Sequence, residues 1–199
     1  MTKLRVNIIF IIIFFFLNLY SNSIANISSN FIDDITDKAS NILSSKDSRE
    51  FKIQELIKIG ENSVDIDGIG FYTLGKHRKS LSDDQKVEFK KIFREYFLKS
   101  FSTRLVEYKE AKIVVISEDV KNEKYTIVKS KLLATSNRPE VAIDWRVYTK
   151  DPLKPLIRDL VIEGLSLART QKEEFNSVIQ NNDGDVNALF KNLEEFLIK

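Results

Sequence analysis

The strongest candidate for chemistry in this sequence is a serine in the stretch EGLSLARTQKEEF, residues 163–175. Gly164, Ser166 and Ala168 come within one residue of G-x-S-x-G, the strained strand-to-helix turn that presents a nucleophilic serine in α/β hydrolases. Such a serine needs a histidine base and an acid that orients the histidine. The one histidine, His77, precedes the serine, whereas hydrolases with this turn place it afterwards. A serine–lysine dyad stays open, although nothing marks a lysine for it.

A structural role for this stretch has more support. Thr170 and Glu173 fit a capping box, which predicts a helix that begins after Thr170 and leaves Ser166 in the preceding strand. Gly164 inside that strand predicts a bulge, or a place where a neighbouring group packs on bare backbone. We therefore expect no catalytic residue.

Metal and nucleotide sites are poorly supported. His77 lies in the polar run GKHRKS, and a lone histidine does not make a zinc site without acidic ligands. The segments at 65–68 and 181–185 match only parts of a calcium loop, so turn and cap roles are expected. The third glycine of a dinucleotide fingerprint is replaced by Thr73. We predict neither a metal nor a cofactor.

The N-terminal residues 1–25 have the pattern of a cleaved signal peptide. A basic start precedes an apolar run at 6–17, and Ser23-Ile24-Ala25 provides small residues at a cleavage site. The run is too short for a membrane anchor, which is the alternative. We predict export and a single mature domain, residues 26–199.

The mature chain has no net charge. Residues 1–25 hold two of the 31 Lys and Arg residues and none of the 29 Asp and Glu residues. A nucleic-acid partner is therefore not expected. The absence of cysteine excludes disulfides, thiol nucleophiles and thiolate metal sites.

The elements that must position any site are helices around a group of strands. The apolar spacing predicts helices at 27–44, 50–59, 83–108, 171–180 and 185–198, and strands at 112–117, 124–134, 141–148 and 156–168. Ser82 and Gln85 form a capping box at the start of the longest helix. Short connections favour antiparallel pairing, so the fold class is α+β, with a sheet of about four strands and helices packed on it.

The longest helix carries an apolar stripe at helical spacing, with Phe89, Phe93, Tyr96, Phe97, Phe101 and Leu105. Core packing is the ordinary role of such a stripe. It could also line a cavity facing the sheet. Periodicity alone does not separate the two.

Several blocks of the sequence resemble the MlaC family, the toluene-tolerance or auxiliary transport proteins that carry phospholipid through the periplasm of Gram-negative bacteria. The blocks are FIDDITDKASNIL, LGKHRKSLSDDQKVEFKKIFREYFLKSFSTRLVEYK, IDWRVY and IRDLVIEGLSLARTQKEEF. The most specific parts are Leu74-Gly75, Phe93 with Tyr96, and Asp159 followed by the segment 163–166. Two departures are His77-Arg78, where the family has aromatic residues, and Pro155, where it commonly has tryptophan.

The resemblance implies a strongly twisted antiparallel sheet whose helices enclose an apolar cavity for acyl chains, with the head group near solvent. It implies a monomeric carrier with bound phospholipid as cargo and two partners. These are an inner-membrane ABC transporter with its lipid-binding ring and an outer-membrane lipoprotein–porin complex. The system would maintain the lipid asymmetry of the outer membrane. An enzyme acting on a small apolar substrate on a cone-shaped α+β scaffold, such as a hydrolase, is the alternative, and a scaffold protein with a filled core is a third.

We place the cavity between the helical stripe and the apolar strand faces. The expected lipid-binding residues are Phe71, Leu74, Phe89, Phe93, Tyr96, Phe97, Phe101, Leu105, Val114, Ile116, Ile127, Ile143, Trp145, Val147, Val161, Gly164 and Leu165. The acids Asp144, Asp159 and Glu163 are expected to pair with Arg146 or Arg158.

Overall fold

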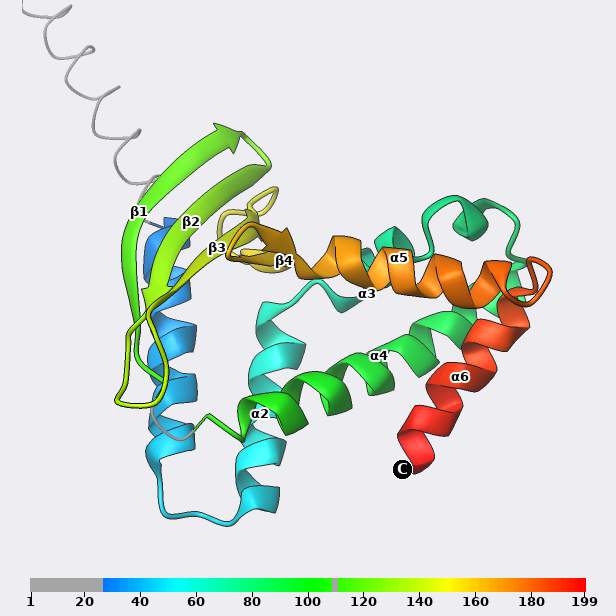
Figure 1. Ribbon diagram of the computed structural model, residues 1–199. Coiled ribbons are helices and arrows are strands. Elements are labelled where there is room, and N and C mark those ends of the chain that lie inside the picture. Colours follow the sequence, from blue (N-terminus) through cyan, green and yellow to red (C-terminus); the bar gives the residue numbers. More distant parts are fainter. Residues whose placement is uncertain (1–26, 109–110) are drawn as a thin grey trace, which may run out of the picture.

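The computed structural model describes residues 27–108 and 111–199, so the predicted signal peptide lies outside the described residues (Figure 1). A helix occupies residues 27–44. The elements that follow are α2 (Arg49–Ser63), α3 (Ile66–Thr73), the short 3₁₀ helix η1 (Gly75–Lys79), α4 (Asp83–Leu105), β1 (Ile113–Asn122), β2 (Tyr125–Leu132), β3 (Val141–Tyr148), β4 (Leu156–Ile162), β5 (Leu165–Ser166), α5 (Leu167–Gln180) and α6 (Val186–Ile198).

The strands form one antiparallel sheet in the order β1-β2-β3-β4-β5, which confirms the α+β prediction. The sheet has five strands because the segment predicted as one strand, 156–168, contains a hairpin turn. Glu163 and Gly164 both have positive φ, 49° and 81°, and Ile162 pairs with Leu165 across them. Two such residues favour the tight turn whose twist matches antiparallel strands. Gly164 is therefore a turn residue, and the predicted bulge is wrong.

The two faces of the sheet differ in burial. On the inner face Val128, Trp145 and Val147 are buried. Val128 of β2 pairs with Trp145 of β3, and Val147 lies two residues further along β3. On the second face Ile127 is opposite Arg146. This alternation is the expected pattern for a sheet with one face on the core.

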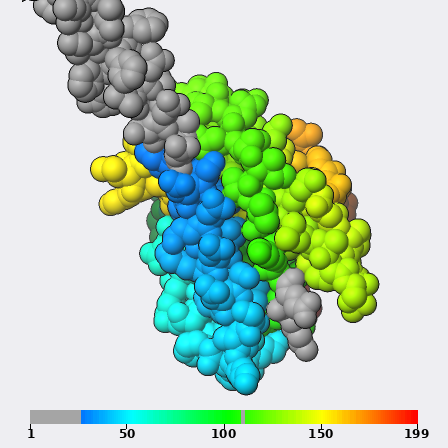
Figure 2. All heavy atoms as spheres, turned by 90° about the vertical axis from the view of Figure 1, so that its left-hand side faces the viewer, coloured from blue at the N-terminus to red at the C-terminus, as the bar shows by residue number. Residues whose placement is uncertain are grey.

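The helix at 27–44 lies along β1 on one side of the molecule, as both views show (Figures 1 and 2). Ile32 and Ile35 belong to the same core cluster as Val128. The backbone N–H and the hydroxyl of Ser29 both donate to Glu118 of β1, at 3.0 and 2.7 Å. The helix is thus fixed to the sheet by apolar packing and by one half-buried carboxylate.

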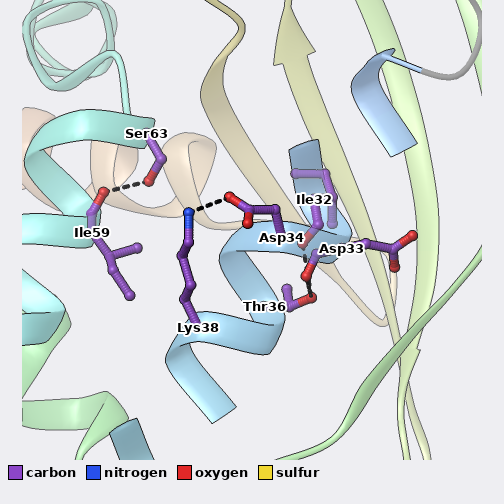
Figure 3. A network of polar contacts seen from close by, with 7 residues as sticks. All are labelled: Ile32, Asp33, Asp34, Thr36, Lys38, Ile59 and Ser63. Carbon is purple, nitrogen blue, oxygen red and sulfur yellow. Dashed lines mark hydrogen bonds and ion pairs between the residues drawn. The ribbon is translucent and has the colours of Figure 1, made fainter. Parts of the chain in front are cut away.

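Hydroxyl groups on the helices at 27–44 and 49–63 are satisfied locally (Figure 3). Thr36 donates to the carbonyl of Ile32 at 2.8 Å, and Ser63 donates to the carbonyl of Ile59 at 2.5 Å. Both residues are buried. Because each hydroxyl bonds within its own helix, neither needs a polar partner on a neighbouring element.

α4 begins where the sequence predicts, with Ser82 and Gln85 forming a reciprocal capping box. It packs against α2, α3 and α6. Two glycines allow this close approach: a Cβ at Gly70 would lie 2.7 Å from the ring of Phe93, and one at Gly60 would lie 3.1 Å from Leu98. α4 is therefore the helix around which α2, α3 and α6 pack.

Within residues 27–108 and 111–199, no helix has the length and apolar content needed to cross a bilayer. The same residues contain no group of three or more His, Asp or Glu side chains arranged to hold a metal ion.

Candidate functional site

Ser166 caps a helix. Its hydroxyl accepts the backbone N–H of Arg169 at 3.1 Å and donates to Asp159 at 2.6 Å. α5 therefore begins at Leu167 with Ser166 as its N-cap, and the predicted cap at Thr170 is wrong. The Thr170 hydroxyl instead donates back to the carbonyl of Ser166 at 3.1 Å.

The partners of Ser166 are not those of a nucleophile. Asp159 is buried and also accepts the backbone N–H of Ala168 at 3.0 Å, while Arg146 lies 3.3 Å away. The histidine, His77, faces Asn176 at 3.1 Å. An acid and a backbone amide hold the hydroxyl, and the base that would activate it points to another residue.

The aromatic stripe of α4 packs on helices. Phe89 and Phe93 are fully buried and stacked, with ring centroids 5.4 Å apart. Phe71 of α3, Phe175 of α5 and Phe190 of α6 contact these two rings at 5.7–6.2 Å. These two rings pack between helices in the core, and their predicted contact with lipid stays a prediction.

The rest of the stripe and its neighbours vary in burial. Leu74 is fully buried, whereas Phe71, Tyr96, Phe97, Phe101 and Leu105 are half-buried. Phe97 stacks on Phe101, with ring centroids 5.8 Å apart. These half-buried rings are the part of the stripe that a ligand could reach with the least repacking.

The predicted strand residues divide between the faces of the sheet. Ile143, Trp145 and Val147 lie on the buried inner face. Val161 pairs with Asp144, which places it on the second face. Its predicted grouping with Trp145 is therefore wrong.

The remaining strand predictions fall at exposed or polar places. Val114 and Ile116 of β1 and Leu165 of β5 are exposed, at 40%, 56% and 62%. A bulge between Val115 and Ser117 shifts the register at Ile116. A Cβ at Gly164 would meet open space, so nothing packs on that glycine. These four residues do not belong to an enclosed cavity.

A cavity of about 570 Å³ lies between α3, the second sheet face and the start of α5. One part of its lining is apolar, with Ile69, Tyr72, Ile127 and Ala168. The other part is charged, with Arg78, Lys121, Arg146, Arg158 and Asp159. Its volume is within the range of about 300–1,000 Å³ typical of small-molecule sites.

One wall of this cavity is held by a polar chain that begins in α3. Asp65 caps α3 by accepting the N–H of Gly68 at 3.0 Å, and Arg158 donates to Asp65 at 2.5 Å. Arg158 also donates to the hydroxyl of Tyr125 at 2.5 Å and stacks 3.5 Å above the ring of Tyr148. Burial acts to lower the pKa of Arg158, but its bonds to Tyr125 and Asp65 outweigh burial and raise that pKa. This arginine is a fixed structural cation.

The other cations of the cavity are less constrained. Arg146 and Lys121 have side chains about half exposed, and they pair with Asp159 and Asp119. Arg78, in η1, is exposed and has no hydrogen-bond or ion-pair partner among residues 27–108 and 111–199. The cavity thus combines an apolar wall with cations that can pair with a further anion, and this combination suits an amphipathic anionic ligand.

The sequence does not point to this cavity. Of the predicted lipid-binding residues, only Ile127 lines the cavity. Arg78 was visible as a departure from the family pattern, and Arg146 as an expected partner of an acid. Their convergence was not visible, because α3, η1, β1 to β4 and α5 meet there only in the fold.

A second hollow of about 530 Å³ lies between residues 43–52 and the end of α4. The two cations that line this hollow already have partners within the protein. Arg49 pairs with Glu107 at 2.8 Å, and Lys52 donates to the carbonyls of Leu43 and Ser45. The hollow between α3 and the sheet is therefore the better candidate for ligand binding.

Comparisons with known proteins agree with the fold. The family model described as "MlaC protein" matches residues 26–195. A phospholipid-binding protein of Ralstonia solanacearum, solved in complex with a phospholipid, superposes with a TM-score of 0.70 at 20% identity. That match covers 85% of this chain and 98% of the other. A search of curated proteins finds no significant match.

Proposed function

Because this chain belongs to the MlaC family, we propose that it is a periplasmic phospholipid carrier. The observation that carries the proposal is the family match over residues 26–195, together with a cavity that is apolar on one side and cationic on the other. The phospholipid-binding protein of R. solanacearum, which has a similar fold, supports the same ligand class.

Physical chemistry explains why such a carrier needs no catalytic group. Moving a two-chain phospholipid through water exposes on the order of 30 methylene groups, which at about 0.8 kcal/mol each is a barrier of roughly 25 kcal/mol. An apolar protein interior removes most of this barrier by replacing the bilayer as the surroundings of the chains. Since the bilayer and the interior are both apolar, loading can be nearly neutral in free energy, and direction must come from the partners.

Loading also requires the protein to open. If each methylene occupies about the volume of a water molecule, roughly 30 Å³, the two chains need roughly 900 Å³. The cavity of about 570 Å³ holds only part of this volume. The rest would come from repacking half-buried apolar residues such as Phe71, Phe97 and Phe101.

The proposed lipid-contacting set therefore differs from the sequence prediction. Ile69, Tyr72 and Ile127 form the first contacts, because they already line the cavity. Tyr96, Phe97, Phe101 and Leu105 are the apolar residues that would take up further chain length. Phe89, Phe93 and the buried inner sheet face act as the rigid core around which opening takes place.

The cellular role follows from the family. We propose that residues 1–25 direct export and that the mature monomer shuttles phospholipid between the outer and inner membranes. Its partners would be an outer-membrane lipoprotein–porin complex and an inner-membrane ABC transporter with its lipid-binding ring. A mature chain without net charge suits transient docking on both.

The test is the lipid content of purified mature protein. Organic-solvent extraction followed by mass spectrometry should release about one phospholipid per protein molecule. Delipidated protein should regain lipid from vesicles and unfold at a higher urea concentration once loaded, because a ligand that binds only the folded state stabilises it. A well-folded sample that neither contains nor takes up lipid would contradict the proposal.

A further inference from the structure

We propose that the cavity between α3 and the sheet binds the phosphate of the lipid head group and gives this carrier a preference for anionic phospholipids. The inference rests on the proposed carrier function and adds the head-group chemistry to it. Its basis is the set of charges that the fold brings to this one cavity.

The cavity has an excess of positive charge. Its lining holds four cations, Arg78, Lys121, Arg146 and Arg158, and one acid, Asp159. Two further carboxylates, those of Asp65 and Asp119, pair with these cations from outside the lining. Counting all seven groups, one positive charge is left without a counter-charge. The chain elsewhere must offset this excess, since the mature protein has no net charge.

Arg78 carries the unpaired charge. Its side chain is exposed at the edge of the cavity, and residues 27–108 and 111–199 provide no partner for it. A guanidinium presents its N–H donors in a planar fork that matches two oxygens of a phosphate. A single phosphodiester at this position would complete the charge balance of the cavity.

Arg146, which lines the cavity from β3, can also contact the phosphate. Its ion pair with Asp159 is 3.3 Å long, and that carboxylate already accepts from Ser166 and Ala168. An arginine has five N–H donors. With its side chain 46% exposed, Arg146 keeps donors that a second anion can use.

The apolar wall favours a lipid phosphate over inorganic phosphate. Ile69, Tyr72, Ile127 and Ala168 share the cavity with the cations, and none of the four side chains supplies an ionic contact. A phosphodiester joined to glycerol and acyl chains covers this surface, whereas a free phosphate leaves it in water. Head groups that also carry an ammonium group meet like charge here, so anionic head groups bind better.

The experiment loads delipidated mature protein from vesicles with equal amounts of phosphatidylglycerol and phosphatidylcholine that have the same acyl chains. Mass spectrometry of the bound lipid then gives the ratio of the two. The variant Arg78→Glu is compared with Arg104→Glu, which makes the same change at an exposed arginine of α4 outside the cavity. Circular dichroism and urea midpoints check that both variants fold.

We expect the wild type to be enriched in phosphatidylglycerol. In Arg78→Glu this enrichment should fall about two- to five-fold, which corresponds to the interaction energies of exposed charge pairs. Arg104→Glu should keep the wild-type ratio, and salt should reduce the enrichment because it screens exposed charges.

Equal binding of both lipids by the wild type would overturn the inference and leave the carrier function standing. No lipid binding at all would overturn the carrier function itself. Arg78-dependent binding of inorganic phosphate alone, without a lipid preference, would assign the site to a free anion.

Discussion

Replacing Ser166 with alanine tests directly whether the hydrolase-like stretch is a helix cap. The change removes one hydroxyl that makes two contacts: it accepts the N–H of Arg169 at 3.1 Å and donates to the buried Asp159 at 2.6 Å. A structural role predicts a loss of stability with no effect on any reaction. A catalytic role predicts the reverse.

The expected size of the loss follows from these two contacts. Loss of a serine N-cap costs about 1 kcal/mol, with a range of roughly 0.5–2. A hydrogen bond to a charged group contributes about 1.5–3 kcal/mol. These two energies do not add in full, because one hydroxyl makes both contacts and Asp159 keeps Arg146 and Ala168 as partners. We expect Ser166→Ala to lower the free energy of unfolding by about 2–3 kcal/mol.

Urea unfolding of delipidated mature protein measures this loss. With an m-value of about 2 kcal/mol/M, the midpoint should fall by roughly 1 M. Ser177→Ala, at an exposed serine of the same helix, is the matched control and should change stability by less than about 0.5 kcal/mol. In a double-mutant cycle with Asp159→Asn, a coupling energy above about 0.5 kcal/mol is expected for groups in contact. An unchanged midpoint, or loss of an esterase activity in a fully stable variant, would refute the capping role.

Three further predictions concern packing, pH and backbone conformation. Gly70→Ala places a methyl group 2.7 Å from the buried ring of Phe93, so urea unfolding should show a loss of about 1–3 kcal/mol. Burial, with a smaller contribution from Glu174, raises the pKa of Tyr96 above its ordinary value. Stability should therefore fall as the pH rises from about 10 through that raised pKa, and Tyr96→Phe should show a smaller fall in urea midpoints measured across this range. Gly164→Ala, at a φ of 81° with open space around the Cβ, should lose about 1–2 kcal/mol from backbone strain alone, and Gly164→Asn less.

The parts of the fold that could be predicted are those fixed by local sequence. The capping box of Ser82 and Gln85 sets the start of α4, and both partners lie within four residues. α3 was missed because Gly68 and Gly70 are poor helix formers. A local cap and a tertiary contact together override that preference: Asp65 caps the helix, and Phe93 packs on the bare backbone of Gly70.

Strand faces were harder to predict than strands. Trp145 was placed correctly on the buried face, because β3 alternates without interruption. Val114 pairs with Lys131 on the second face, and both Val114 and Ile116 are exposed, so neither faces the core. Val161 pairs with Asp144 on the second face, and Leu165 is exposed because it follows the turn at Glu163-Gly164. β1 and β4 have apolar residues on both faces, so the sequence pattern does not show which face of these strands is buried.

Asp159 links the stretch that resembles a hydrolase to the proposed binding site. Its carboxylate accepts from Ser166 and Ala168 on one side, which fixes the start of α5 against β4. On the other side it pairs with Arg146 and itself lines the cavity. Ser166, which the nucleophile pattern singles out, therefore supports one wall of the proposed ligand cavity, and its hydroxyl orients an acid. The proposed carrier function requires no bond to be broken, so Ser166 and Asp159, which an enzyme could use for reaction, can serve instead to hold α5 against β4.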